Sequence, residues 1–281
     1  MNIIQFRNQF RKSLSSKFEI NEIDFIFKKL LNYFFNLEST IIGLSPRLEL
    51  SASQEFKLIE ALKLINNNCP LQYVIGKSTF MDFEIYVDSN VLIPRPETEE
   101  LVNYVLESTK NDDTIFDLCT GSGCIALGLK NKNSSLNVTG IDISNDAILI
   151  AVKNSEKLNL NINWIVEDLK KIITKDASID IIVANPPYVH PNEKEIMHSR
   201  VLNFEPHMAI FTPKNDPTYY YKYCINFAKK SLKVGGKLFF EINPFYAKEI
   251  ETLLVNSNFN NIDIKLDVYG KKRMLSSQRN G

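Results

Sequence analysis

The chain has 281 residues, of which 44% are hydrophobic and 23% are charged. These values are close to those of globular proteins, so they exclude a disordered or fibrous chain, and the length allows one large domain or two smaller ones. Basic and acidic residues number 33 each, which argues against a broad phosphate-binding surface, and we expect no direct binding to nucleic acid.

The cysteines and the lengths of the apolar runs exclude further classes of protein. None of the four cysteines forms a Cys-x-x-Cys pair, and nothing completes a zinc set around Cys119 and Cys124. No apolar run reaches the ~18–20 residues of a membrane span, and the first residues lack the order of a signal peptide. We expect a cytoplasmic protein without a metal site or a membrane contact, and we expect it to be a monomer.

Residues 1–70 have the apolar spacing of helices. Asn21 is a candidate cap for a second helix, and Ser51 to Gln54 resembles a capping box before a third helix that ends near residues 66–68. The segment contains one glycine, Gly43, and no cluster of chemically reactive side chains. It predicts a small helical domain that serves either packing or the recognition of a macromolecular partner.

Residues 71–96 change character and predict a linker. Residues 78–87, STFMDFEIYV, are rich in aromatic and β-branched side chains, which indicates a hairpin or an extended connector. The sequence LIPRPETEE follows, and its two prolines hold Arg95 in extended backbone. Glu97 lies at the start of the next helix, where a negative charge suits the helix dipole.

From about residue 112 onward, short apolar runs alternate with helical stretches. This alternation favours an α/β domain with a mostly parallel sheet covered on both faces. We expect helices near 124–131, 145–158, 217–233 and 244–257. We expect strands over 114–118, 137–141, 162–166, 179–184, 237–242 and 261–266.

A glycine turn follows the first of these strands. The chain has only 10 glycines, yet three of them fall within residues 121–128. Gly121 and Gly123 allow a close approach of backbone to a ligand at the carboxyl end of the strand. The pattern is neither the dinucleotide fingerprint nor a phosphate-binding Walker loop. Asp117 before the turn suits a ligand with a positive ammonium group.

Two carboxylates follow the next two strands. Asp142 lies roughly 20 residues after the glycine turn, where a carboxylate can accept hydrogen bonds from a ribose diol. A helix N-terminal cap is the structural alternative for such a residue. Asp168 ends the third strand, where an adenine would lie.

The motif Asn-Pro-Pro-Tyr at residues 185–188 directly follows an apolar strand. Two adjacent prolines cannot continue a sheet, so they hold Asn185 at the strand's carboxyl end. The side-chain oxygen of Asn185 and the carbonyl of Pro186 can accept the two N–H groups of a planar NH2 group, and Tyr188 can cover its face.

Together these motifs resemble the class I S-adenosylmethionine-dependent methyltransferases that act on planar nitrogen. Residues 70–100, Phe204 to Pro206, residues 233–242 and residues 267–273 resemble, more narrowly, the peptide chain release factor glutamine methyltransferases. The resemblance implies a Rossmann-like, seven-stranded methyltransferase domain over 97–281, a β-hairpin linker over 71–96 and a helical substrate-recognition domain over 1–70. The family methylates the glutamine side chain in the Gly-Gly-Gln motif of class 1 release factors.

The motifs and the resemblance together assign the site. Asn185, Pro186 and Tyr188 are the expected catalytic residues, and Pro187 belongs to the expected substrate site. The resemblance implies that Arg95 and Glu97 complete that site. Cys119 and Leu169 depart from the family, which usually has a glycine and often an aromatic residue there. The expected contacts of S-adenosylmethionine are Asp117, Cys119, Thr120, Gly121, Ser122, Gly123, Asp142, Asp168, Leu169 and Asn185.

Three alternatives remain open at this point. The first is a glutamine methyltransferase that acts on a ribosomal protein. The second is an adenine or guanine amino-group methyltransferase of nucleic acid, which shares the Asn-Pro-Pro-Tyr motif. The third is a silent binding module whose helical domain docks on a translation factor.

Overall fold

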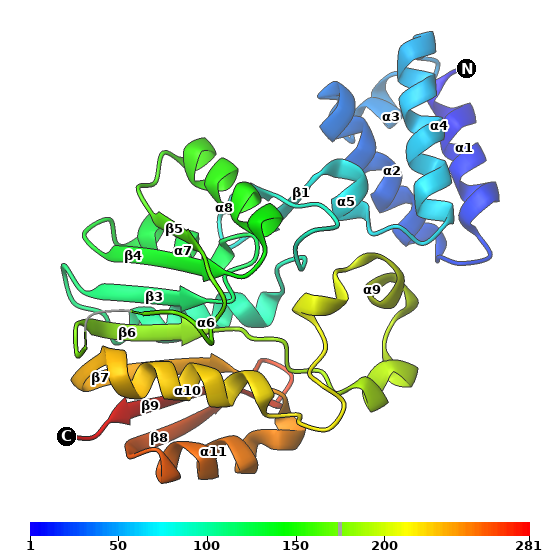
Figure 1. Ribbon diagram of the computed structural model, residues 1–281. Coiled ribbons are helices and arrows are strands. Elements are labelled where there is room, and N and C mark those ends of the chain that lie inside the picture. The colour runs from blue at the N-terminus through cyan, green and yellow to red at the C-terminus, as the bar shows by residue number, and fades with distance from the viewer. Residues whose placement is uncertain (174–175) are drawn as a thin grey trace. The chain divides into compact units, whose positions relative to one another are not determined.

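The computed structural model describes residues 1–173 and 176–281, and it divides the chain into two compact units, Met1–Gly76 and Lys77–Gly281 (Figure 1). The short helix α5 (Leu71–Ile75) belongs to the first unit, and the hairpin formed by β1 (Lys77–Phe80) and β2 (Phe83–Tyr86) belongs to the second. Among these described residues, no helix is both long and apolar enough to cross a membrane.

The first unit is a helical bundle around an aromatic core. Its other helices are α1 (Ile3–Leu14), α2 (Ile20–Phe35), α3 (Ile41–Leu44) and α4 (Ala52–Asn66). The rings of Phe10 and Phe27 lie 5.1 Å apart between α1 and α2, and both are fully buried. Burial of such rings stabilises a small helical bundle.

The capping predictions for this unit had opposite outcomes. Ser51 accepts a hydrogen bond from the backbone N–H of Gln54, so the predicted capping box is confirmed. The predicted cap at Asn21 is wrong, because α2 already begins at Ile20 with Glu19 in the cap position. The N–H of Ile23 bonds to the carbonyl of Glu19, so Asn21 lies inside the first turn.

The second unit contains a seven-stranded sheet with the order β5-β4-β3-β6-β7-β9-β8. The strands from β5 to β7 run parallel, and β9 pairs antiparallel with both β7 and β8, which confirms the mostly parallel α/β class. The strands are β3 (Thr114–Leu118), β4 (Asn137–Asp142), β5 (Asn163–Val166), β6 (Ile179–Ala184), β7 (Leu232–Glu241), β8 (Phe259–Leu266) and β9 (Lys272–Arg279).

Helices cover both faces of this sheet. Helix α7 contacts both α6 and α8, and α10 contacts α11 (Figure 1). Two neighbouring residues of β7 show the two faces, because Phe239 packs edge-on against Tyr104 of α6 and Phe240 packs edge-on against Tyr221 of α10. The main helices are α6 (Pro96–Leu106), α7 (Cys124–Lys132), α8 (Asn145–Leu158), α10 (Tyr219–Ser231) and α11 (Ala247–Asn256).

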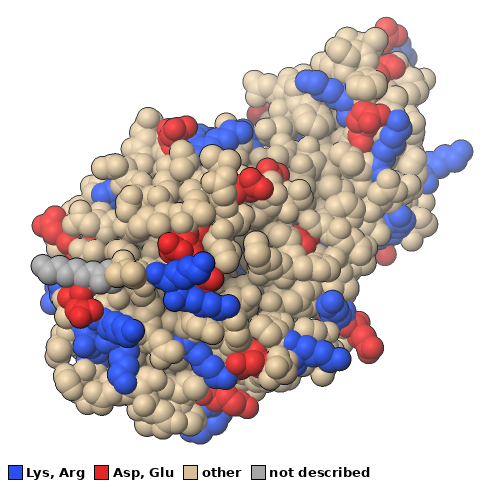
Figure 2. Space-filling model, in the orientation of Figure 1, with Lys and Arg blue, Asp and Glu red and all other residues tan. Residues whose placement is uncertain are grey.

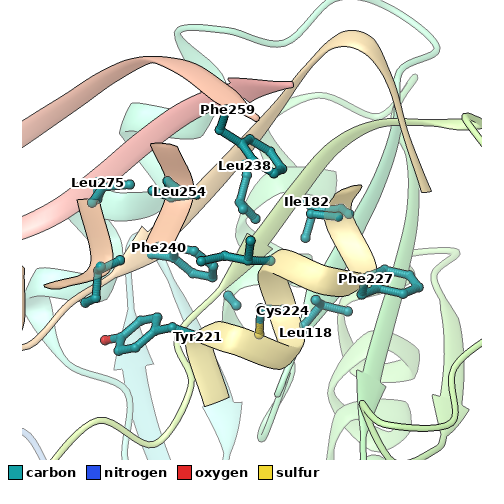
Figure 3. Close-up of a cluster of buried hydrophobic side chains, with 14 of the residues drawn as sticks. Leu118, Ile182, Tyr221, Cys224, Phe227, Leu238, Phe240, Leu254, Phe259 and Leu275 are labelled. Carbon is teal, nitrogen blue, oxygen red and sulfur yellow. The ribbon is translucent and has the colours of Figure 1, made fainter. Parts of the chain in front are cut away.

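The core on the α10 and α11 face is continuous. Figure 3 shows Tyr221 and Cys224 of α10 among the side chains of the strands, and these residues are fully buried together with Leu238 and Phe240. Because α10 is fixed in this way, its first turn is held at the carboxyl ends of the parallel strands.

Figure 2 shows basic and acidic side chains interspersed over the face that is drawn.

Candidate active site

The carboxyl ends of the parallel strands surround one cavity of about 280 Å³. The chain runs outward from β3 to β5 and then returns to β6 on the other side of β3, so the cavity lies at the switch point where open α/β sheets bind ligands. The predicted site residues that line it are Cys119, Thr120, Gly121, Ser122, Asp142, Asp168, Leu169, Asn185 and Pro187. Among the described residues, the lining does not include Asp117, Gly123, Arg95, Glu97, Pro186 or Tyr188.

The glycine turn between β3 and α7 has a left-handed backbone. Gly123 has φ +83°, and a Cβ atom there would lie 2.7 Å from the ring of Trp164, so both the backbone and the space require glycine. Cys119 also has a positive φ of 59° although it carries a side chain. Cys119, which stands where the resembled family usually has a glycine, therefore occupies a strained backbone position in the cavity wall.

Asp117 lies beneath this turn. Its Oδ2 accepts hydrogen bonds from the hydroxyl of Thr120 and from the backbone N–H of Ala126, 3.2 Å away. Its Oδ1 is buried and has no hydrogen-bond partner in the described part of the chain. Burial raises the pKa of Asp117 to about 7. Oδ2 of this carboxyl group therefore connects β3 to the start of α7, and Oδ1 can still accept a hydrogen bond.

Asp142 joins the end of β4 to the glycine turn. Its two oxygens accept hydrogen bonds from the backbone N–H groups of Gly121 and Ser144, both at 2.9 Å. Removal from water raises the pKa of Asp142, although these N–H groups act in the opposite direction. Ser144 itself is the cap of α8, through its bond to the N–H of Ala147. A carboxylate has about four acceptor positions, so Asp142 retains capacity for the hydroxyls of a ligand.

The far end of the cavity is lined by tyrosines that the sequence did not assign to it. Leu169 lines the cavity and also packs against the sheet core. Tyr219, Tyr220 and Tyr223 of α10 line the same cavity. The amine of Lys170 lies 5.2 Å from the ring centre of Tyr219. The four-residue spacing of Tyr219 and Tyr223 is a signal that places both on one face of a helix.

Asn185 is held at the other end of the cavity by its amide nitrogen. Its Nδ2 donates to Glu241 Oε2 at 3.0 Å and to Thr98 Oγ1 at 3.3 Å. The Asn185 side-chain oxygen is therefore left to accept hydrogen bonds from another group. The hydroxyl of Tyr188 donates to the other oxygen of Glu241 at 2.8 Å. Burial and this carboxylate raise the pKa of Tyr188 well above its ordinary value.

Glu241 and Thr98 were missed as site residues. Glu241 ends β7 and is only 1% exposed, and Thr98 lies in the first turn of α6. One signal was available, because a carboxylate at the carboxyl end of an apolar parallel strand lies at the ligand edge of the sheet.

Arg95 has a partner that the sequence did not predict. Its Nη2 lies 2.6 Å from Oε1 of the buried Glu205. Glu97 lies in the first turn of α6 and is half-buried. Contact of Arg95 or Glu97 with a substrate stays a prediction. In the described part of the chain, no group of three or more His, Cys, Asp or Glu side chains is arranged to hold a metal ion.

This fold and this cavity define a methyltransferase of the Rossmann-like class. A methyltransferase small domain family matches residues 97–203. A methyltransferase from Pyrococcus furiosus has a similar fold, with a TM-score of 0.52, 14% identity and 82% of this chain and 100% of that chain covered. The ribosomal protein L11 methylase of Lactobacillus delbrueckii subsp. bulgaricus has a TM-score of 0.50 and 21% identity, over 70% of this chain and 86% of that chain.

Full-length relatives define the particular family. The chain is 37% identical to the release factor glutamine methyltransferase of Flavobacterium psychrophilum over an alignment of 280 residues, and the match covers 98% of each chain. It is 32% identical to the protein of the same name from Bacteroides thetaiotaomicron, over 96% of this chain and 97% of that one. The chain belongs to the family of release factor glutamine methyltransferases.

Proposed function

We propose that the chain transfers a methyl group from S-adenosylmethionine to a glutamine side-chain nitrogen, and that this glutamine belongs to the Gly-Gly-Gln motif of class 1 peptide chain release factors. The names of the full-length relatives support the substrate. The observation that carries the chemistry is the orientation of Asn185, whose NH2 group is bonded to Glu241 and Thr98. Its oxygen has no hydrogen-bond partner among the described residues, so it can accept an N–H from a planar amide.

The residues of the cavity match the chemical groups of the methyl donor. Asp142 would accept from the ribose hydroxyls, and Asp168 and Leu169 would lie at the adenine. The Oδ1 of Asp117, which has no hydrogen-bond partner among the described residues, would be an acceptor near the turn, and a positively charged amino acid end would favour the ionised carboxylate. Gly121 leaves open space where a side chain would begin, and this allows close approach of a ligand. When bound, S-adenosylmethionine supplies an electrophilic methyl group on a sulfonium.

The protein's contribution to the reaction is orientation of the acceptor. An amide nitrogen is a poor nucleophile because its lone pair is delocalised into the carbonyl group. Acceptance of its two N–H groups by Asn185 Oδ1 and the Pro186 carbonyl draws electron density toward nitrogen and fixes its direction. The methylated nitrogen is strongly acidic afterwards, so no base is needed before transfer. Preorganised dipoles of this kind account for a large part of many enzymatic accelerations.

The helical unit Met1–Gly76 is the proposed recognition domain for the release factor. Residues of this unit form its hydrophobic core, yet Ile20, Phe25 and Phe56 are all more than half exposed. Large apolar side chains on the surface are available for a protein partner. Replacement of Phe25 and Phe56 by Ser is expected to raise KM for the release factor without a change in kcat.

A substitution of Asn185 tests the proposed chemistry. Asn185→Ala removes one acceptor of the substrate amide, and by analogy with a lost oxyanion-hole donor it should raise the barrier by about 2–4 kcal/mol. The exposed Asn192 in the 3-10 helix Pro191–Ile196 after the motif provides a matched control, Asn192→Ala, which should retain activity. Full turnover by Asn185→Ala on a release factor would show that this mechanism is wrong.

A further inference from the structure

In the described part of the chain, the side chain of Glu241 accepts three hydrogen bonds, one from α6 and two from the Asn-Pro-Pro-Tyr motif. Its Oε2 accepts from the hydroxyl of Thr98 at 2.7 Å and from Asn185 Nδ2 at 3.0 Å. Its Oε1 accepts from the hydroxyl of Tyr188 at 2.8 Å. A carboxylate that is 1% exposed is costly to bury, and three donors are what makes such burial tolerable.

This arrangement permits only one orientation of the Asn185 amide. Thr98 directs its proton to Glu241, so the lone pairs of its oxygen accept from Asn185 Nδ2. Glu241 Oε2 and Thr98 Oγ1 are therefore both acceptors, and the NH2 group of Asn185 donates to both. A rotation by 180° would place the amide oxygen against a carboxylate and a hydroxyl oxygen, and it would turn a donor toward the substrate position.

We propose that Glu241, together with Thr98, is a positioning residue that keeps the Asn185 side-chain oxygen directed as an acceptor toward the substrate amide. This inference rests on the proposed function, because only an NH2 substrate needs an acceptor there. Neither side chain has to touch the reacting atoms. Glu241 acts through Asn185, because it determines whether the oxygen or the nearly isosteric NH2 group of the Asn185 amide faces the cavity.

The charged groups around Glu241 are consistent with an anionic network. Burial raises the pKa of Glu241, and the charge of Glu97 raises it further. The hydrogen bonds from Thr98 and Tyr188 and the charge of Arg273 lower it. The guanidinium of Arg273 lies 6.0 Å from the ring centre of Tyr188, so a cation stands behind the tyrosine that bonds to Glu241. Since all three direct partners donate, a proton on Glu241 would displace one of them.

A double-mutant cycle tests the inference kinetically. Glu241→Gln keeps the size of the side chain but offers an NH2 group, so it no longer enforces one orientation of Asn185. We expect a fall in kcat of at least about tenfold with an unchanged Kd for S-adenosylhomocysteine. In the Asn185→Ala background the same change should cost less than about twofold, because residues that act as one unit are not additive. Equal losses in both backgrounds would overturn the inference.

Thr98 provides a second variant that preserves the buried carboxylate. Thr98→Val removes the hydroxyl at nearly constant volume, whereas Thr98→Ser keeps it, so kcat of the Ser variant should exceed that of the Val variant at least about fivefold. Asp180→Asn is a matched control, because Asp180 bonds to Thr114 N–H and to Lys233 at the opposite end of the sheet. A loss of kcat in the control as large as that in Glu241→Gln would contradict a specific role for Glu241.

A measurement without substrate separates this inference from the proposed function. The side-chain NH2 resonances of Asn185, assigned by their absence from Asn185→Ala, should exchange slowly with solvent in the wild type and faster in Glu241→Gln and Thr98→Val. Identical exchange in all three proteins would overturn the positioning role. An active Glu241→Gln with wild-type kcat would also overturn it. A wild type that does not methylate a release factor would instead contradict the proposed function.

Discussion

Arg95 and Glu205 lie 110 residues apart in the chain and form an ion pair, with 2.6 Å between Arg95 Nη2 and Glu205 Oε1. The second oxygen of Glu205 accepts from the N–H of Ile93 at 3.2 Å. The side chain of Glu205 is only 2% exposed. Pro94 and Pro206, the neighbours of this pair, both line the cavity, so the pair joins two walls of the site.

Separation of this pair should cost stability. Glu205→Gln leaves a partly buried guanidinium without its carboxylate, and we expect the free energy of unfolding in urea to fall by about 1–3 kcal/mol. Arg95→Ala should have a similar effect, and the double variant should be no worse than Glu205→Gln alone. The control is Lys248→Ala, which removes an exposed ion pair with Glu251 and should change stability by about 0–1 kcal/mol.

The same variants separate two roles for Arg95. If Arg95 only supports the cavity wall, the KM for the release factor should change in parallel for Arg95→Ala and Glu205→Gln. A large rise in KM for Arg95→Ala alone, with unchanged stability, would favour the direct substrate contact that the sequence predicts.

Asp117 should make stability depend on pH. Its pKa is about 7 in the folded protein and near 3.8 ordinarily, so the folded state holds a proton that the unfolded state releases. The stability from this group is therefore fully present below about pH 4 and is lost as pH rises through about 7. The free energy of unfolding of the wild type relative to Asp117→Asn should fall between pH 5 and pH 7. Parallel curves for the two proteins would contradict a raised pKa.

A calorimetric titration tests whether Asp117 faces the positive end of the cofactor. A cation beside the carboxyl group favours its ionised form, so binding of S-adenosylhomocysteine at pH 6 should release a proton to the buffer. The release is measured from the binding enthalpy in buffers of different ionisation enthalpy. Asp117→Asn should release none, and an equal release by both proteins would assign the proton to another group.

Cys119→Gly should stabilise the second unit. Cys119 has a φ of 59°, where a side chain costs about 1–2 kcal/mol and glycine costs nothing sterically. The greater freedom of glycine in the unfolded chain offsets part of this gain, so we expect about 0.5–1 kcal/mol. Thermal or urea unfolding measures the change. Cys119→Ala keeps the strain and should give no gain, and an equal gain for both variants would contradict this explanation.

Gly140→Ala should destabilise the sheet through Trp164. A Cβ atom at Gly140 would lie 2.3 Å from Cζ3 of the Trp164 ring, and overpacking of this kind costs about 1–3 kcal/mol. The double variant Gly140→Ala with Trp164→Leu should be less unstable than the sum of the two single variants. Gly43→Ala is the control, because no atom of the described residues lies within 4 Å of its added Cβ atom. Additive losses would exclude a clash with Trp164.

The sequence predicted the parts of the fold that depend on local patterns. The strand around Ile181 and the helix from Asn145 have the expected bounds, because apolar runs, caps and proline act over a few residues. The last strand, β9, was not among the strands predicted from the alternation. Only Met274 and Leu275 of its eight residues are apolar, and its place between β7 and β8 comes from pairing rather than from its own pattern.

In the candidate site, too, local patterns could be predicted and tertiary contacts could not. Asp142 and Asn185 could be placed at one edge of the sheet, because strand ends that run parallel meet there. The bonds of Asn185 to Thr98 and Glu241 could not be predicted, since they span 87 and 56 residues. Such contacts depend on the tertiary arrangement of α6 and β7. The pairing of Arg95 with Glu205 was missed for the same reason.

One assay identifies the methyl acceptor directly. The purified protein is incubated with labelled S-adenosylmethionine and three acceptors, which are a class 1 release factor, the same factor with its Gly-Gly-Gln glutamine changed to alanine, and total RNA. Mass spectrometry then locates the added methyl group. We predict a single methyl group on that glutamine and none on the alanine variant or the RNA. Methylation of the RNA, or of none of the three, would contradict the assignment.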